Sequence, residues 1–388
     1  MRIIFASDMS LNYIDTPLSP SEATLLFADA EREFKKADFS VLNLETVFGE
    51  RNDYTPLLKS GPSLLCSYDN FAYIDALRPS LLGMANNHAR DFCDEALFDT
   101  MKFLDSKGYM HIGVGMNLDE AYKPAFFDKD GTRVAIYAIA ENEPGYAEDD
   151  HGGMAGYNIT RVTRAIRSAR ERGELPIIYF HGGNETNPFP SPAKTELYRH
   201  FVDLGAAAVI AMHTHCPQGV EYYNGAPIIY SMGNFYFPCN ERRLESWYYG
   251  YMTALEIDGD RVSCEIIPYT FDKEYHKILD GEERVKFMRY MDYISAPLSD
   301  ANRIREYFGG WCVKLGINGL LPRLKYDPKM LEGAPSKEIA LLKNLLGCEA
   351  HNELLTLSAK VMYDGKVDEY AKIIPELEML QNMQIPEA

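Results

Sequence analysis

The sequence predicts an α/β fold that is followed by a helical C-terminal region. From residue 1 to about residue 270, short apolar runs typical of buried strands alternate with stretches that carry helix start signals. Beyond about residue 273 the apolar residues recur at helical spacing instead, as Phe287, Met291 and Ile294 do. We therefore expect one α/β domain over residues 1–270 and a helical region over residues 273–388.

Seven short runs of mostly apolar residues predict the strands of the first domain. Their continuous apolarity indicates that most of these strands are buried on both faces. In chain order the runs cover residues 3–6, 39–42, 81–84, 134–137, 177–180, 207–210 and 228–230. Two helix starts are also marked: Ser19-Pro20 with Glu22 has the pattern of a capping box, and Ser191-Pro192 repeats its first two residues.

Composition and charge exclude several classes of function. The 39 Lys and Arg stand against 57 Asp and Glu, and the formal net charge of −18 repels phosphate backbones, so nucleic acid is not expected as a general partner. No stretch reaches the roughly 18 uncharged apolar residues of a membrane span, and the first apolar run is too short for a signal peptide. The seven cysteines lack CxxC spacing, which argues against a disulfide framework. We therefore expect a cytoplasmic protein with no membrane span of its own.

Residue types that bind metal ions follow directly or closely on several of the apolar runs. Strand ends hold side chains rigidly while the next loop leaves them open, so donors from several strands can converge on one ion. A single histidine in this position is more often a satisfied core residue than a ligand, but here the pattern recurs. The residues that share it are Asp8, Glu45, Asn87, His88, His181, His213 and His215.

This mixture of carboxylate, imidazole and amide donors predicts a divalent metal, Mn, Fe or Zn, bound as one or two ions. Cysteine is absent from the set, which argues against a closed structural zinc site. Two ions that share a carboxylate would activate a water and bind a phosphoryl oxygen. The pair His213 and His215 leaves two geometries open, because extended backbone would put both rings on one side and a turn would direct them to neighbouring ions.

Five sequence motifs contain these residues. They are Phe5-Ala-Ser-Asp8, Val41-Leu-Asn43-Leu-Glu45, Ala85-Asn-Asn-His88-Ala-Arg-Asp91, His181-Gly-Gly-Asn-Glu185, and His213-Thr-His215 with Ile229-Tyr-Ser-Met-Gly-Asn-Phe235. In this order they resemble the bacterial capsule synthesis protein CapA, or poly-γ-glutamate biosynthesis, family, which looks like a branch of the calcineurin-like metallophosphoesterases. The resemblance covers roughly residues 1–270, and five motifs in the right order make it specific.

The resemblance implies a four-layer αββα sandwich and a site for two metal ions. One ion would lie among Asp8, Glu45 and His215. Glu45 would bridge to the second ion, whose other ligands would be Asn87, His181 and His213.

The resemblance also implies that His88 is the proton donor to the leaving oxygen. Asp91 lies close enough in the sequence to orient its imidazole, although an aspartate that only stabilises a helix dipole is an equal alternative. Four residues are candidates for substrate contacts or for holding the ligands, with a simple turn as the other interpretation of the last one. They are Asn43, Asn86, Glu185 and Asn234.

Three features depart from the family pattern. Asp8 is followed by Met9 and Ser10 rather than by the usual Asp-x-His pair, so the first metal site is expected to be one histidine short and either weak or empty. The usual His-Trp-Gly-x-Glu has Gly182 in place of tryptophan, which predicts a wider or looser pocket. Typical members are also membrane-anchored, whereas the sequence shows no anchor.

We therefore expect a metal-dependent hydrolase in which a metal-activated water attacks a phosphoester, linked to capsule or poly-γ-glutamate synthesis. One alternative is a non-catalytic factor that holds an anionic polymer in the same cleft and works with other capsule-assembly proteins. Another is an amide hydrolase that uses the same metal site. In each case the region 273–388 is expected to pack beside the sandwich and to shape access to the site.

Overall fold

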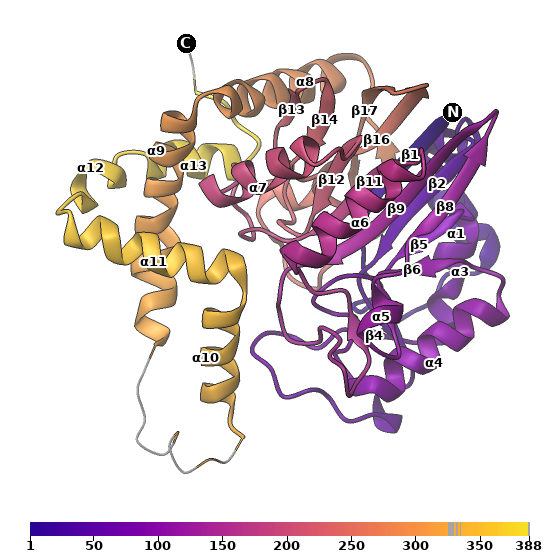
Figure 1. The fold of residues 1–388 in the computed structure, drawn as a ribbon. Helices are drawn as coiled ribbons and strands as arrows, with labels where there is room; N and C mark the ends of the chain where they lie inside the picture. Colours follow the sequence, from indigo (N-terminus) through magenta and orange to yellow (C-terminus); the bar gives the residue numbers. More distant parts are fainter. Residues whose placement is uncertain (325–329, 331–332, 334, 387–388) are drawn as a thin grey trace.

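The structure is a computed structural model that describes residues 1–324, 330, 333 and 335–386 (Figure 1). Its core is built from two large sheets. The first has eight strands in the order β18 (His276–Ile278), β17 (Arg261–Phe271), β16 (Tyr249–Asp258), β1 (Arg2–Met9), β2 (Phe39–Leu44), β5 (Leu81–Gly83) and β6 (His111–Ile112), with β15 (Asn234–Tyr236) also paired to β1. The second has six, in the order β13 (Val220–Tyr223), β14 (Ala226–Ile229), β12 (Ala208–Met212), β11 (Leu175–His181), β9 (Thr132–Ala140) and β8 (Ala125–Lys129).

The two sheets pack face to face through large side chains. Tyr179 of β11 donates a hydrogen bond from its hydroxyl to the carbonyl oxygen of Ala6 in β1, at 2.6 Å, and its ring centroid lies 5.7 Å from that of Phe5. Phe39 of β2 stacks on Phe127 of β8 with their centroids 4.2 Å apart. These contacts close a core in which most strand side chains are fully buried.

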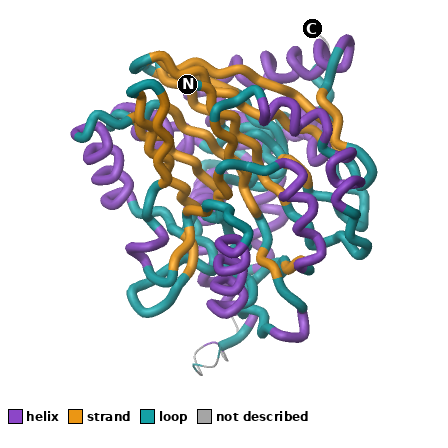
Figure 2. The backbone as a smooth tube through the Cα atoms, turned by 90° about the vertical axis from the view of Figure 1, so that its right-hand side faces the viewer, coloured by secondary structure: helices purple, strands orange, loops and turns teal. Residues whose placement is uncertain are grey.

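Helices cover the outer faces of both sheets (Figure 2). Phe27 and Phe34, at the start and near the end of α2, pack on Phe235 of the first sheet, and Tyr198 of α7 packs on Phe180 of the second. The four-layer αββα sandwich is therefore confirmed. Its helices are α1 (Pro20–Leu26), α2 (Ala28–Lys35), α3 (Ala72–Leu77), α4 (Cys93–Ser106), α5 (Leu118–Ala121), α6 (Ile159–Glu171) and α7 (Pro192–Asp203).

Both marked helix starts are confirmed. Ser19 and Glu22 form a reciprocal capping box at α1, in which the Ser19 amide donates to the Glu22 carboxylate at 2.8 Å. The Ser191 hydroxyl caps α7 by accepting the amide of Lys194 at 3.2 Å. Each of the seven predicted strand runs also overlaps a strand of the structure.

The helical region follows β18 and runs along one side of the sandwich (Figure 1). It consists of α8 (Gly281–Ser295), α9 (Ala301–Trp311), the π-helical segment η5 (Cys312–Leu320), α10 (Lys337–Gly347), α11 (Glu349–Tyr363), α12 (Val367–Ala371) and α13 (Ile374–Gln381).

Side chains of this region pack into the same apolar core as the sandwich, and Trp311 and Leu377 are among its buried members. The division into domains at residues 270–273 stays a prediction. Among the helices in the described part of the chain, none combines the length and the apolar character that a membrane span requires.

The parallel strands of the two sheets set up the site. In the first sheet β1, β2 and β5 run parallel, and in the second β9, β11, β12 and β14 do. The carboxyl ends of parallel strands meet at one edge of a sheet, which is where ligands bind in such folds. Two short paired segments, β3 (Val47–Phe48) with β4 (Leu65–Cys66) and β7 (Val114–Gly115) with β10 (Gly153–Met154), follow beyond these ends.

Candidate metal centre

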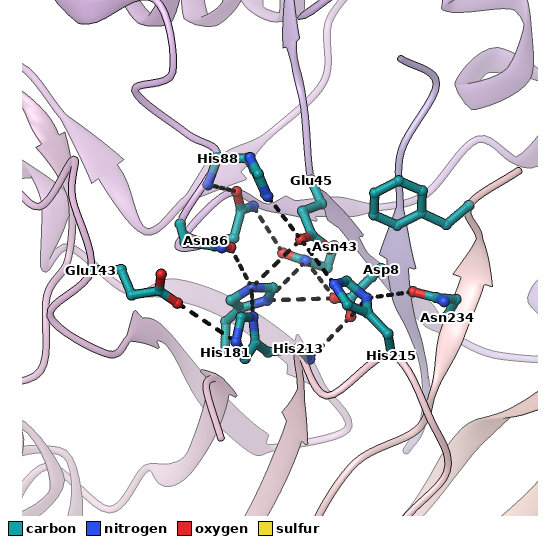
Figure 3. Close-up of polar contacts among 12 residues, drawn as sticks. Asp8, Asn43, Glu45, Asn86, His88, Glu143, His181, His213, His215 and Asn234 are labelled. Atoms are coloured by element: carbon teal, nitrogen blue, oxygen red, sulfur yellow. Dashed lines mark hydrogen bonds and ion pairs between the residues drawn. The ribbon is translucent and has the colours of Figure 1, made fainter. Parts of the chain in front are cut away.

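The predicted donors converge at the carboxyl ends of β1, β2, β11 and β12 (Figure 3). Asp8 lies near the end of β1, Glu45 directly follows β2, and His181 ends β11. His213 and His215 lie just after β12. All five side chains are buried, with at most 4% of any of these residues exposed.

The donors form two groups that share one carboxylate. Glu45 lies with His181 and His213 in the first group, and with Asp8 and His215 in the second, each with one ligand atom per residue and all such atoms within 4.8 Å of one another. Within the first group, Nδ1 of His213 is 3.0 Å from Nε2 of His181. In the second, Nε2 of His215 is 3.9 Å from Oε1 of Glu45. This arrangement could hold one or two divalent ions.

The two histidines after β12 separate because the backbone turns there. Their φ angles are positive, 95° at His213 and 54° at His215, so the segment leaves the extended conformation at the end of the strand. Of the two geometries that the sequence leaves open, the structure has the turn, and each ring contributes to a different donor group.

The electrostatics of Glu45 fit a bound cation. The residue is fully buried, and neither carboxylate oxygen has a hydrogen-bond partner among the described residues. Burial, together with the nearby charge of Asp8, raises the pKa of Glu45 well above its usual value. A buried carboxylate without partners is strongly unfavourable, and a cation between the two groups would satisfy it.

The pKa of Asp8 is shifted in the opposite direction to that of Glu45. Burial alone would raise its pKa, but hydrogen bonding and charge from His181, the charge of His215 and the amide of His213 lower it. Asn43 adds a hydrogen bond from Nδ2 to Oδ1 of Asp8 at 2.8 Å. The pKa of Asp8 is therefore lowered while that of its neighbour Glu45 is raised, which is the expected outcome for two carboxylates in one buried site.

Amide side chains hold the donors in place. Oδ1 of Asn234 lies 2.8 Å from Nδ1 of His215, which turns Nε2 of that ring toward Glu45. Oδ1 of Asn87 lies 3.0 Å from Nε2 of His181, on the side of the first donor group. Asn86 donates from Nδ2 to the carbonyl of Leu44 at 2.8 Å, and its Oδ1 accepts the amide of His88 at 3.1 Å.

His88 and Asp91 form a hydrogen-bonded pair beside Glu45. Nδ1 of His88 is 2.6 Å from Oδ2 of Asp91, and Nε2 lies 3.8 Å from Oε1 of Glu45. Because α4 begins only at Cys93 and Asp91 points at the imidazole, the geometry favours the orienting role over the dipole alternative. Burial, the largest influence, lowers the pKa of His88 despite the opposing effect of Asp91, so the free ring is neutral near pH 7.

Two residues in the site were missed by the sequence reasoning. Lys59 comes from a loop, makes a buried ion pair with Asp91, and places Nζ 3.3 Å from Nδ1 of His88. No pattern in the sequence marks it. Glu143 follows β9 and lies 3.6 Å from Nε2 of His213, and burial together with Glu185 raises its pKa to about 8. It lies after a predicted strand, so the rule that found the other donors could have included it.

Gly182 and Glu185 both lie outside the two donor groups. Gly182 has no room for a side chain, since an added Cβ would lie 2.5 Å from Cγ of Glu141. The Glu141 carboxylate accepts the amide of Gly183 at 2.8 Å and pairs with buried Lys194, so a charged pair occupies the space beside position 182. Glu185 is exposed and stands at the rim of the site rather than in either donor group.

A cavity of about 410 Å³ opens onto these residues. One side is formed by the sandwich, including His88, Glu143 and His215. The helical region forms another side through Leu315, Leu320, Arg323, Leu341, Asn344, Leu345 and His351. Its role in access to the site stays a prediction.

The comparisons with known proteins agree on one family. The family model described as bacterial capsule synthesis protein PGA_cap matches residues 5–239. The "PGA biosynthesis protein CapA" of Bacillus subtilis is 24% identical over 237 residues, which is 60% of this chain and 62% of that protein. The "Capsule biosynthesis protein CapA" of Bacillus anthracis is 27% identical over 164 residues, or 41% of this chain and 40% of that protein.

A third relative is named "Probable polyglutamine synthesis accessory protein" and comes from Mycobacterium tuberculosis. It is 27% identical over 214 residues, which cover 51% of this chain and 55% of that protein. The chain therefore spans less than two thirds of the length of each of these relatives.

Proposed function

Because the chain belongs to the bacterial capsule synthesis protein PGA_cap family, we propose that it acts in the synthesis of a capsule or of poly-γ-glutamate as a metal-dependent phosphoester hydrolase. One observation carries the hydrolytic part: two buried donor groups share Glu45, and the His88–Asp91 pair stands directly beside that carboxylate. A structural metal site has no need of a separate histidine–aspartate pair facing its cavity.

Under this proposal Asp8, Glu45 and His215 would hold one ion, and Glu45, His181, His213 and Asn87 would hold the other. Nitrogen and oxygen donors without cysteine suit Mn, Fe or Zn. Such ions, when bound, lower the pKa of a water and stabilise the charge that develops on a phosphoryl group.

The protein's own residues then position and move the proton. Asp91 accepts from Nδ1 of His88 and so favours the tautomer whose Nε2 faces the cavity. An anionic phosphoester next to Nε2 raises the pKa of His88, because a negative charge favours the protonated ring. Nε2 then gives its proton to the leaving oxygen, while Asp91 holds the ring in place.

Metal content and hydrolysis test this proposal. Wild-type protein purified without chelators is expected to carry a transition metal by elemental mass spectrometry, and to hydrolyse part of a phosphoester panel. The His181→Ala/His213→Ala double variant should lose metal and activity together. If folded wild-type protein takes up none of Mn²⁺, Zn²⁺ or Fe²⁺, the hydrolase proposal fails.

The relative from Mycobacterium tuberculosis is named as an accessory protein of polymer synthesis, which favours a second candidate, an accessory factor that holds a polymer without cleaving it. Poly-γ-glutamate binding that is unchanged in His88→Ala, together with no hydrolysis of phosphoesters or amides, would support this candidate over the first. Release of amine from an amide polymer would instead identify an amide hydrolase that uses the same donors.

A further inference from the structure

Arg243 lines the same cavity as His215 but has no part in the proposed chemistry. It lies in the loop between β15 and the 3-10 helix η3 (Glu245–Tyr248) and is exposed to solvent. Its side chain contacts the thiol of Cys239, and its guanidinium carbon lies 5.4 Å from the ring centroid of Trp247. The guanidinium is therefore accessible to a ligand, while its contact with the indole restricts its position.

Trp247 is held close to one of the metal donors. Its indole Nε1 donates to the carbonyl oxygen of Phe237 at 2.8 Å, and the residue is buried. Asn234, whose Oδ1 contacts the ring of His215 (Figure 3), donates from Nδ2 to the carbonyl oxygen of Trp247 at 3.2 Å. The indole also lies against the imidazole of His215, with their ring centroids 4.6 Å apart. A single indole ring therefore separates the guanidinium of Arg243 from a proposed metal ligand.

Among the described residues, no carboxylate forms an ion pair with Arg243. The neighbouring Arg242 pairs with Glu245 at 2.6 Å and lies outside the cavity lining. Burial raises the pKa of Cys239, so its thiol is neutral near pH 7 and leaves the charge of Arg243 uncompensated. The carboxylate that acts most strongly on Arg243 is that of Glu241, which also lies outside the lining. An anion of a bound ligand would therefore be the closest countercharge of this guanidinium.

Two further cations line the cavity. Lys59 is buried and already paired with Asp91, so its charge is balanced. Arg323 is exposed at the end of the 3-10 helix η6 (Leu321–Arg323) and reaches the cavity from the helical region. Of the three cations, Arg243 is the one that the described structure connects to a metal donor, through the indole against which it packs.

Two carboxylates line the cavity on the side of β9 and β11. Glu143 lies 3.6 Å from Nε2 of His213, and Glu185 is exposed in the loop after β11. Each is close enough to the other for the charge of Glu185 to add to the effect of burial in raising the pKa of Glu143. Neither carboxylate is among the main electrostatic influences on Arg243. The cavity therefore has an acidic side near His213 and a basic side at Arg243.

The chemistry of a guanidinium limits what can bind to it. It offers only hydrogen-bond donors, arranged in a planar fork that matches two oxygens of a carboxylate or a phosphate. Because Arg243 is exposed, solvent and salt screen such a pair, and its contribution to affinity is smaller than that of a buried pair.

We propose that Arg243 determines specificity by binding a second anionic group, a carboxylate or a phosphate, on the non-reacting part of the substrate. The inference rests on the proposed function, which places the reacting phosphoester at the metal donors of the same cavity. A volume of about 410 Å³ is large enough for a phosphoester that carries such a group on a short flexible chain.

Binding of three phosphonates tests this role by isothermal titration calorimetry on the full chain as purified with its metal. Phosphonates replace phosphate esters here because their C–P bond is not hydrolysed. The compounds 6-phosphonohexanoate, hexane-1,6-diphosphonate and 6-phosphonohexanamide end in a carboxylate, a second phosphonate and an uncharged amide. At low salt, at least one of the two doubly anionic ligands should bind about 5-fold more tightly than the amide, and the tighter one identifies the second anion. Equal affinity for all three, or no binding of any, would overturn the proposal.

Variants then locate the preference. In Arg243→Met, which keeps an apolar chain over Trp247, the advantage of the anionic ligand should fall below about 2-fold, with the affinity for the amide unchanged. Arg242→Met removes the same charge from the adjacent residue outside the cavity lining, and should keep the full preference. An equal loss in both variants would indicate a general effect of net charge and contradict the proposal. So would a preference that survives in Arg243→Met but disappears in Arg323→Met.

Hydrolysis of the matching phosphate esters separates this inference from the proposed function. A preference for the anionic ligands without any phosphate release would support the role of Arg243 and contradict the hydrolase proposal. Phosphate release with equal kcat/KM for all three esters, together with equal affinity for the three phosphonates, would support the hydrolase and contradict the role of Arg243.

Discussion

The two regions that face each other across the cavity contribute different kinds of side chain. The strand ends of the sandwich supply charged or metal-type donors, of which Glu45 is central, and every one of these lies next to another titratable group. The helical region supplies leucines, the neutral polar side chains of Asn344 and His351, and the guanidinium of Arg323. This difference suggests that the reaction is carried by the strand ends of the sandwich, and the choice of substrate by the helices together with Arg243. Substitutions at the strand ends of the sandwich should then leave the substrate preference unchanged, and substitutions in the helical region should leave metal binding unchanged.

The largest effect is expected at Glu45, the residue that both donor groups share. Glu45→Gln should abolish metal binding at both groups, and with it all hydrolysis, because the bridging charge is lost. Without metal, the variant should nevertheless be more stable than metal-free wild type by about 1–3 kcal/mol, since a buried unpaired carboxylate is removed. Elemental analysis and urea unfolding in chelator would measure both effects.

The stability difference at Glu45 has a defined pH dependence. Its folded pKa lies above the unfolded value, so the destabilisation is present at high pH and disappears as the pH falls below the unfolded pKa. The gain of Glu45→Gln should therefore shrink toward pH 4. Glu185→Gln, at the exposed rim, is the matched control and should keep its metal. Full metal content in Glu45→Gln would contradict the shared-carboxylate site.

The second effect separates proton transfer from metal binding within the sandwich. His88→Ala should lower kcat by about 10²- to 10⁴-fold, the usual contribution of a general acid, with unchanged metal content. Asp91→Asn should act in the same direction, because Nδ1 of His88 loses its charged partner. Steady-state kinetics with metal analysis would check this, and His200→Ala, an exposed histidine on α7, is the control. Loss of metal in His88→Ala would mean that the ring is a ligand rather than an acid.

Sequence reasoning succeeded where a residue's neighbours in the chain determine its place. Asp8 and His181 lie at strand ends because an apolar run precedes each of them, and the capping box at Ser19 depends on residues within one turn. Glu143 also follows the end of a strand, so the same rule could have predicted it. Lys59 and His351 were not, because a loop and a helix carry them to the cavity from far along the chain, and only tertiary packing decides that.

The third prediction is that weakening the attachment of α11 to the sandwich leaves the metal donors unaffected. Glu353 of α11 accepts hydrogen bonds from the Ser191 hydroxyl at 2.5 Å and from the amide of Ala193 at 2.9 Å, which ties α11 to the start of α7. Glu353→Ala should lower the free energy of unfolding by about 1.5–3 kcal/mol and raise KM, with metal content unchanged. Lys360→Ala, exposed on the same helix, should change neither. A parallel loss of metal would show that the two sides of the cavity are not independent.

The smallest effect concerns a titrating group in the sandwich core outside the donor groups. His276 of β18 is packed among Phe27, Phe235 and Tyr269, and burial lowers its pKa to about 3. The unfolded ring binds a proton near pH 6.5 and the folded ring does not, so stability falls as the pH drops through 6.5 and is independent of this group above it. Between pH 7.5 and pH 6.0, wild type should lose about 1 kcal/mol more than His276→Leu, measured by urea unfolding. Parallel pH profiles for the two proteins would assign the acid sensitivity to the donor groups instead, and would break the separation between a neutral core and a titrating site.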